Sequence, residues 1–303
     1  MKHMKHRKGT AGRLAVVAGL LILSLLLSSC SVWRWMWAEE TVTPPEFSDL
    51  IIGADDTPYP NAVAYDPDET HTGTDIYYIG TGANKDYIIV IDAGHQAKAN
   101  NEKEPIGPGS DIMKPKVSQG AEGEKTGSEY AFNLSVALFL RDELYARGYS
   151  VVMIRETDDV DISNKERAEI ANKYQAAAYV RIHANSSDNT EIKGALTMCP
   201  TAANPYPACA ARYEESRLLS ETVLDAFCEA TSRDKREIIE TDDMTGLNWA
   251  NVPSTIVEMG FLSNPSEDST MANIWFHRDA AEGIANGIDA YIKALPAIAD
   301  AKQ

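Results

Sequence analysis

Two histidines and two glutamates occupy positions from which their side chains can meet. His95 follows the apolar run IIVI, which is typical of a buried strand, and His183 ends a second apolar segment. Glu258 lies near the end of a third such segment, and Glu129 opens the helical pattern that follows the first strand. Because ligands of open α/β sheets bind beyond the carboxyl ends of the strands, these side chains are expected at one edge of a sheet.

The chemistry available to this set is metal binding or proton transfer. Catalytic zinc sites usually take three histidine or carboxylate ligands and leave a fourth position for water. Of the six histidines in the chain, His3 and His6 lie in a basic N-terminal segment, and His71 lies in an acidic one. His277 has no partner suggested by its spacing. Only the other two histidines stand at predicted strand ends.

Each of these residues also has a simpler structural explanation. Thr126 and Glu129 have the spacing of a capping box, and a histidine at a strand end is often a structural hydrogen-bonding residue. Glu258 is harder to explain in this way, because burying an unpaired carboxylate in an apolar strand is costly. Asp92 and Asn185 flank the histidines in sequence and are candidates for orienting their rings.

The elements that must position these residues alternate between strands and helices. This alternation predicts an α/β fold, with a largely parallel or mixed twisted sheet of about six strands flanked by helices in a single catalytic domain. Ser163 and Glu166 have capping-box spacing before one of the helices. The predicted strands are 75–79, 86–92, 150–154, 178–183, 194–198 and 254–259, and the predicted helices are 128–147, 163–175, 212–230 and 279–295.

The N-terminus has the pattern of an export signal. Five basic residues precede the 14-residue apolar run Leu14–Leu27, which is short for a membrane span. The segment LSSC that ends at Cys30 is similar to the lipobox of bacterial lipoproteins, and this similarity implies cleavage before Cys30 and its lipidation. The alternative is an uncleaved signal anchor that continues into SVWRWMW. Both interpretations hold the rest of the chain at the outer face of the cell membrane, in the cell envelope.

Composition divides the chain and excludes one class of partner. Residues 1–29 are the expected signal peptide, 30–74 an acidic Pro-rich tether, 75–296 the catalytic domain and 297–303 a tail. The net charge of −17 argues against nucleic-acid binding, which needs clustered lysine and arginine. Cys199 and Cys209 are close enough in sequence to form a disulfide outside the cell, although the spacing does not require one.

Five ordered segments resemble the zinc-dependent N-acetylmuramoyl-L-alanine amidases of the amidase-3 type. They are IIVIDAGH, TGSEYAFNLSVALFLRDELYARGYSVVMIRETD, NKERAEIAN, RIHANSS and STIVEMGFLSNPSED, and the resemblance covers about Tyr87 to Leu295. It implies that His95, Glu129 and His183 bind one Zn²⁺ and that Glu258 is the catalytic glutamate. The implied reaction is hydrolysis of the amide between the lactyl group of N-acetylmuramic acid and the L-alanine of the stem peptide, so the implied partner is peptidoglycan.

Arg155 and Arg167 also fall within these segments, but ion pairing within the fold explains them as readily. The chain departs from the family in two places. Where the family usually has two glycines after its first histidine, this sequence has Gln96 and Ala97. The 33 residues between His95 and Glu129 are rich in proline and glycine and form a longer connection than usual, which suggests a lid or a substrate-selecting wall.

Two other functions are compatible with the same ligand set. One is a zinc peptidase that cuts within the stem peptide, and the other is an inactive, metal-bearing adaptor of the envelope. The presence of Glu258 argues against the adaptor, because a binding protein has no need of a general base. An activating protein is compatible with the sequence, but no segment identifies one.

Overall fold

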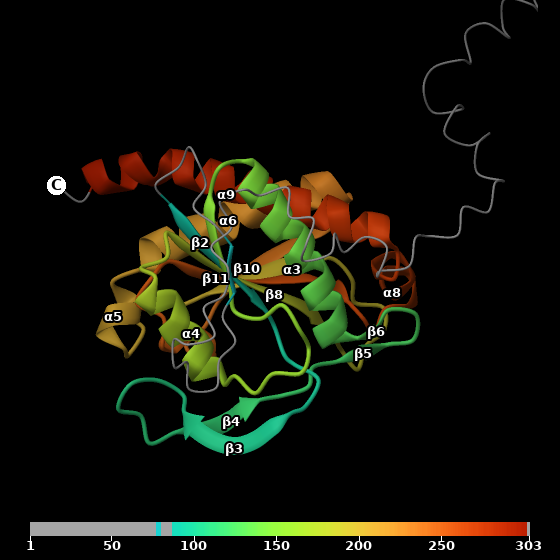
Figure 1. Cartoon of the computed structure of the whole chain (residues 1–303), viewed down its shortest axis with the longest axis horizontal. Coiled ribbons are helices and arrows are strands. Elements are labelled where there is room, and N and C mark those ends of the chain that lie inside the picture. Colours follow the sequence, from blue (N-terminus) through green and yellow to red (C-terminus); the bar gives the residue numbers. More distant parts are fainter. Residues whose placement is uncertain (1–76, 80–86, 302–303) are drawn as a thin grey trace, which may run out of the picture. The chain divides into compact units, whose positions relative to one another are not determined.

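A mixed sheet forms the centre of the computed structural model, which describes residues 77–79 and 87–301 (Figure 1). In the described residues this sheet has seven strands in the order β1-β7-β2-β8-β11-β9-β10. The four central strands, β7, β2, β8 and β11, run parallel, whereas β1 pairs antiparallel with β7 and β9 pairs antiparallel with β11. The strands are β1 (Tyr77–Ile79), β2 (Ile88–Ala93), β7 (Ser150–Met153), β8 (Ala178–Asn185), β9 (Ala195–Cys199), β10 (Lys235–Glu240) and β11 (Ser254–Phe261).

Helices cover both faces of this sheet, as Figure 1 shows. On one face, α3 (Glu129–Ala146), α6 (Tyr213–Thr231) and α9 (Ile274–Ala301) share a buried core with alternate residues of the central strands. On the other face, α4 (Asn164–Lys173) packs in a second core beside α7 (Thr245–Asn248). Because both faces are buried, the central strands consist of continuous apolar runs rather than alternating patterns.

The predicted fold class is confirmed, and the differences lie in polar or short elements. Strand β10 was not predicted, because its sequence KREIIE carries charges typical of an edge strand. Helix α9 begins at Ile274, five residues before the predicted start at 279. The short helices α5 (Pro207–Ala210) and α8 (Pro265–Met271) were also not predicted. The capping box at Ser163 is present, with both of its reciprocal hydrogen bonds.

The long connection between β2 and α3 forms two hairpins outside the main sheet. The larger pairs β3 (Asn100–Pro105) with β4 (Met113–Val117), and the smaller pairs β5 (Glu122–Gly123) with β6 (Gly127–Ser128). The larger hairpin is tied to the core: Glu104 accepts a hydrogen bond of 3.0 Å from the backbone of Lys165 in α4. The indole of Trp249 donates one of 2.9 Å to the Pro105 carbonyl. Because these contacts hold the hairpin to the core, they favour the predicted substrate-selecting wall over the predicted lid.

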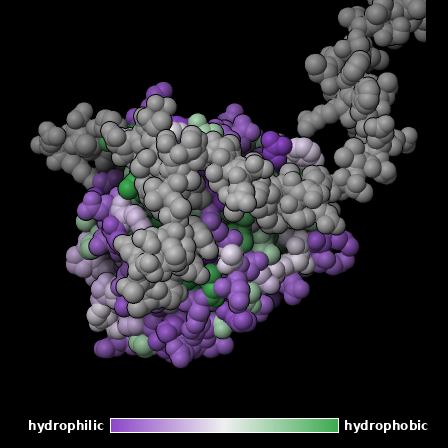
Figure 2. Space-filling model, viewed as in Figure 1, coloured by the Kyte–Doolittle hydropathy of each residue, from purple (hydrophilic) through white to green (hydrophobic). Residues whose placement is uncertain are grey.

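Several predicted features lie outside the described residues. These are the signal segment 1–29, the lipidation site Cys30 and the tether 30–74. Within the part of the chain that the structure describes, no helix is both long and apolar enough to cross a membrane. Cys199, Cys209 and Cys228 are free cysteines, so the disulfide considered between Cys199 and Cys209 is not formed in the described structure. The face shown in Figure 2 is mainly hydrophilic where it is coloured.

Candidate metal centre

Three of the predicted side chains meet at the carboxyl edge of the sheet. His95 follows β2, His183 lies near the end of the neighbouring parallel strand β8, and Glu129 is the first residue of α3. Glu129 Oε1 lies 3.2 Å from His95 Nε2 and 3.1 Å from His183 Nδ1. The two histidine nitrogens are 3.2 Å apart. Among the described residues, this is the group of histidine and acidic side chains able to hold a metal ion.

The spacing of these three atoms fits a tetrahedral zinc site. Zinc bonds of about 2.0 Å to nitrogen and oxygen give a tetrahedron whose edges are about 3.3 Å long. The observed separations of 3.1–3.2 Å are close to this edge length on all three sides. Two ring nitrogens and a carboxylate oxygen are also ligands that zinc prefers. The residues therefore fit the metal that the sequence implies.

The ring of His95 is oriented by the segment that follows β4. Its Nδ1 lies 2.9 Å from the carbonyl oxygen of Ser118 and 3.1 Å from the hydroxyl of the same residue. A carbonyl can only accept, so Nδ1 carries the proton and donates to it. This tautomer leaves the Nε2 lone pair facing Glu129 and His183, which is the arrangement that a metal-binding histidine needs.

The carboxylate of Glu129 is held by backbone groups from two other segments. Oε2 accepts a hydrogen bond of 2.8 Å from the Ala121 backbone, and Oε1 accepts one of 3.1 Å from the Ala184 backbone. Burial opposes ionisation, but the adjoining imidazole rings of His183 and His95 hold the pKa of Glu129 well below its usual range. The residue is therefore an anion in the folded protein.

The alternative role of Glu129 as a helix cap is wrong. Helix α3 has Ser128 at its N-cap and no side-chain capping bond. Thr126, the proposed partner, donates its hydroxyl to the carbonyl of Asp268 at 2.9 Å. The Asp268 carboxylate in turn accepts from the backbone of Lys125 at 2.7 Å and of Thr126 at 2.9 Å. This buried aspartate holds the β5–β6 hairpin that leads into Glu129.

His183 is neutral at physiological pH. Burial lowers its pKa to about 4, against the opposing effect of the Glu129 hydrogen bond. Its Nδ1 faces His95 Nε2 and Glu129 Oε1, whereas its Nε2 is buried and has no hydrogen-bond partner within the described ranges. A neutral imidazole is the form that binds a metal.

Glu258 lies beside this cluster, on β11. Its backbone partner in the neighbouring strand β8 is His183. The residue is partly exposed, but its Oε2 is buried without a hydrogen-bond partner in the described structure. Burial and the negative charge of Glu129 raise the pKa of Glu258 to about 8, and the opposing charge of Arg181 does not cancel them. A carboxyl group poised near neutral pH can both accept and return a proton.

Comparison with known proteins identifies the family. The sequence profile described as N-acetylmuramoyl-L-alanine amidase, Amidase_3, matches residues 89–290. The chain belongs to this family. It is therefore a peptidoglycan hydrolase that cleaves the amide between N-acetylmuramic acid and the L-alanine of the stem peptide.

The chain is similar to curated relatives and to solved structures over 58–69% of its length. The uncharacterized protein YqiI of Bacillus subtilis is 26% identical over 181 residues, which make up 58% of this chain and 82% of that protein. The amidase AmiC of Neisseria meningitidis is 25% identical over 238 residues, covering 68% of this chain and 52% of its own length. The catalytic domain of CwlV, an amidase from Bacillus (Paenibacillus) polymyxa, is 27% identical with a TM-score of 0.55, over 68% of this chain and 98% of that one. The amidase Ami1 of Mycobacterium smegmatis, 24% identical, shares the fold with a TM-score of 0.63 over 69% of this chain and 98% of its own.

The two predicted orienting residues of this amidase contact other groups. Asp92 is fully buried, and its carboxylate accepts hydrogen bonds from Arg167 at 2.6 Å, Arg181 at 2.8 Å and the hydroxyl of Tyr179 at 3.0 Å. Burial opposes its ionisation, but the two guanidinium charges keep the pKa of Asp92 well below its usual range. The side chain of Asn185 accepts from the backbone of Ser186 at 2.7 Å. Any effect of Asp92 on a histidine is therefore indirect, through the arginines.

Sequence reasoning did not identify the groups that support the amidase's cluster. Ser118, the backbone of Ala121 and Asp268 come from loops and a short helix whose contacts are not local in sequence. Ion pairing within the fold, expected for Arg155 and Arg167, is confirmed, since Arg155 pairs with Asp158 at 2.8 Å and Arg167 with Asp92 at 2.6 Å. The position of both arginines within segments that resemble the family is the sequence feature that could have indicated a role near the site.

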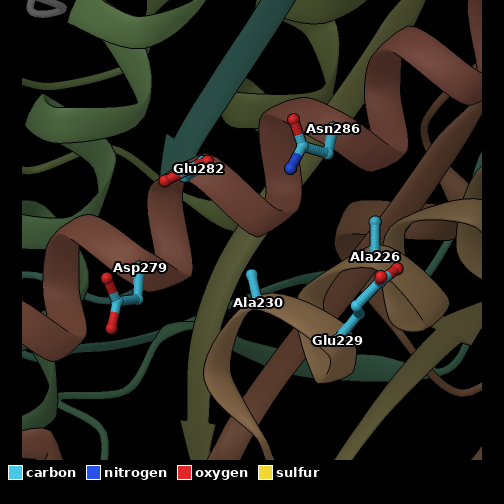
Figure 3. Close-up of a pocket in the computed structure, with 6 residues that line it drawn as sticks. All are labelled: Ala226, Glu229, Ala230, Asp279, Glu282 and Asn286. Carbon is cyan, nitrogen blue, oxygen red and sulfur yellow. The ribbon is translucent and has the colours of Figure 1, made fainter. Parts of the chain in front are cut away.

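Two hollows on the surface of the amidase lie beside different parts of the fold. A groove of about 730 Å³ is lined by Lys98–Glu102 and Asp159–Asp161, and it is bounded by the loop that follows His95. A smaller hollow of about 250 Å³ lies between α6 and α9 (Figure 3). It is lined by Ala226, Glu229, Ala230, Asp279, Glu282 and Asn286, and none of these residues belongs to the metal cluster.

The close packing of Gly94 against His183 leads to a first prediction. A Cβ atom at Gly94 would lie 2.2 Å from two atoms of the His183 ring, so Gly94→Ala must displace that ring. We expect its zinc affinity to fall by about 10- to 100-fold, the usual cost of disturbing the support of a metal ligand. Competition with a chromophoric chelator measures this affinity.

The matched control for this substitution is Gly109→Ala in the β3–β4 connection. A Cβ atom there meets no atom within 4 Å, and the φ of +78° adds a backbone strain for alanine that Gly94 does not have. Its zinc affinity is expected to match that of the wild type. Equal affinities for all three proteins would contradict the proposed position of the His183 ring as a ligand.

The raised pKa of Glu258 predicts a pH-dependent stability of the metal-free protein. Between the ordinary pKa of 4.5 and the folded value of about 8, the folded state keeps a proton that the unfolded chain has released. The free energy of unfolding therefore falls as pH rises through this window.

Glu258→Gln cannot ionise, so we expect its Tm to exceed that of the wild type by about 2–4 °C or more at high pH. Thermal melts in chelator at pH 5 and pH 8.5 test this, since the difference in Tm between the two proteins should be much smaller at pH 5 than at pH 8.5. A constant difference at both pH values would contradict it.

Proposed function

We propose that this amidase uses one Zn²⁺ held by His95, Glu129 and His183, with Glu258 as the general base and acid. The observation that carries the proposal is the equal spacing of the three ligand atoms, 3.1–3.2 Å on each side. The raised pKa of the neighbouring Glu258 supports its role in proton transfer. Buried groups with perturbed pKa values beside a possible metal site are typical of catalytic centres.

The reaction needs a strong nucleophile and a protonated leaving group, because an amide is a poor electrophile. When bound, zinc polarises the carbonyl and lowers the pKa of a bound water to about 7. The Glu258 carboxylate accepts a proton from the attacking water, and the oxygen of this water adds to the lactyl carbonyl carbon. The carbon–nitrogen bond then breaks, and Glu258 returns the proton to the departing nitrogen. The products are a muramic acid carboxylate and a peptide with a free L-alanine amino group.

The remaining residues of the site hold the reacting groups in place. Ser118 fixes the tautomer of His95, and the Ala121 and Ala184 backbones fix both oxygens of Glu129. Positioning of this kind lowers the entropy cost of reaching the transition state. The anchored β3–β4 hairpin stands beside the loop that follows His95 and supplies a wall against which a glycan or peptide strand can lie.

We further propose that the protein acts in the cell envelope, held at the outer face of the membrane by a lipid on Cys30. The support for this is the basic start, the apolar run Leu14–Leu27 and the LSSC segment. Metabolic labelling with a fatty acid, compared between the wild type and Cys30→Ala, tests the lipid. Label that persists in the variant would contradict the assignment of Cys30.

The decisive experiment for the activity is to identify the products released from purified peptidoglycan. Mass spectrometry is expected to find intact stem peptides with free L-alanine amino termini. Their release should stop on chelation and return when zinc is added. Cleavage within the stem peptide would instead identify a zinc peptidase. Zinc binding without any product from peptidoglycan would favour the adaptor.

A further inference from the structure

His95 has a backbone conformation that residues with side chains rarely adopt. Its φ is +63°, in the left-handed region that favours glycine. The family usually places glycines directly after this histidine, whereas this chain has Gln96 and Ala97. The loop that carries the ligand therefore cannot rely on glycine at these positions. Strained conformations persist only where the surrounding structure holds them.

Arg167 of α4 supplies such support from beneath the loop. The side chain is fully buried, and all five of its N–H groups have acceptors. Nη1 donates to Asp92 at 2.6 Å and to the Ala93 carbonyl at 3.0 Å. Nη2 donates to the carbonyl of His95 itself at 3.1 Å and to the Gln96 side chain at 3.0 Å. Four of the five acceptors thus belong to the segment 92–96.

Gln96 holds the segment that follows His95 through its own hydrogen bonds. It is fully buried, and its Oε1 accepts from Arg167 and, at 3.1 Å, from the backbone of Ile162. Its Nε2 donates to the carbonyl of Lys98 at 3.1 Å and to Asp161 at 3.4 Å. The glutamine therefore ties the loop that follows His95 to the chain segment that leads into α4.

We propose that Arg167 and Gln96 are positioning residues that hold His95 in its left-handed conformation and so preorganise its Nε2 for zinc. The inference rests on the proposed zinc function. Neither side chain touches the ligand nitrogens, and both act through the backbone on either side of His95. A ligand that is fixed before the metal arrives loses less conformational freedom on binding, so the metal binds more tightly.

Arg181 provides a matched control for Arg167. It is also a buried arginine, and it donates to the other oxygen of the same Asp92 carboxylate at 2.8 Å. Its second partner is Asn164, at 2.7 Å, and it makes no hydrogen bond to the backbone of the loop 93–96 in the described structure. Loss of a buried Asp92 ion pair is therefore common to both arginines, whereas of these two only Arg167 donates to the backbone of the His95 loop.

The test measures metal binding by the full chain in four forms: wild type, Arg167→Lys, Gln96→Ala and Arg181→Lys. Zinc affinity is measured by chelator competition, the site geometry by the visible absorption of bound Co²⁺, and the stability of each metal-free protein by Tm. We expect Arg167→Lys and Gln96→Ala to bind zinc about 10- to 100-fold more weakly and to have altered Co²⁺ spectra. Arg181→Lys should keep the affinity and the spectrum of the wild type, whatever its Tm. If Arg167→Lys does not fold, Gln96→Ala decides, because it leaves every arginine in place.

Two results would overturn the positioning role while leaving the zinc proposal intact. In the first, Arg167→Lys and Gln96→Ala lower Tm but leave zinc affinity and the Co²⁺ spectrum unchanged, so that the residues only stabilise the fold. In the second, Arg181→Lys weakens zinc binding as much as Arg167→Lys does. A wild-type protein that binds neither metal ion would overturn the zinc proposal itself, and the positioning role with it.

Discussion

Replacing Glu258 with glutamine is expected to lower the rate of amide hydrolysis by about 10²- to 10⁴-fold, the usual contribution of a general acid–base group. Glutamine has nearly the same shape but cannot accept a proton from water or return one to the leaving nitrogen. The glutamate lies opposite His183 in the neighbouring strand and has a pKa of about 8, so it can transfer protons near neutral pH. The rate is measured as the release of free amino termini from purified peptidoglycan.

The zinc content of Glu258→Gln separates this role from metal binding, and it should equal that of the wild type. Glu156→Gln is the matched control, because burial also raises the pKa of Glu156, yet that residue pairs with Arg141 at 2.8 Å and is not a member of the cluster. Its activity should remain close to wild type. A Glu258→Gln protein that kept more than about a tenth of the rate would show that proton transfer depends on another group.

Replacing the proposed zinc ligand His183 with alanine is expected to abolish both the activity and the stabilisation by zinc. Zinc at 100 times its Kd stabilises the wild-type protein by about 2.7 kcal/mol. For a domain of this size, that corresponds to a Tm increase of roughly 5–10 °C. His183→Ala leaves Glu129 and His95 without their third partner, so adding zinc should not raise its Tm. Thermal melts with and without zinc, together with the peptidoglycan assay, measure both effects.

His277→Ala is the appropriate control for that variant. The His277 ring is also largely buried, with partners at 2.7 Å in the hydroxyl of Ser135 and the carbonyl of Met271, but it is not part of the cluster. This variant should lose stability and yet keep its response to zinc. If His183→Ala showed the same zinc-induced rise in Tm as the wild type, the metal would be bound elsewhere.

The class of fold could be predicted from the sequence, because the relevant signals are local. Long apolar runs bounded by polar residues predicted the buried central strands, and the Ser163 capping box predicted the start of α4. The same patterns placed His95, His183 and Glu258 at the carboxyl ends of strands. Neighbouring parallel strands end at one edge of a sheet, so local patterns were enough to bring these residues to the same region. Strand β10 was missed, because the charges of an edge strand hide its alternation.

The contacts of these side chains could be seen in the tertiary structure alone, because their partners come from distant parts of the chain. The sequence around Glu129 alone favours a helix cap and its resemblance to the family favours a metal ligand, whereas in the structure the backbones of Ala121 and Ala184 hold its carboxylate. Asp92, a predicted orienting residue for a histidine ring, contacts two arginines instead. The support of His95 by Arg167 joins residues 72 positions apart through a hydrogen bond to a carbonyl. Such a bond leaves no pattern in the sequence, since every residue has a carbonyl.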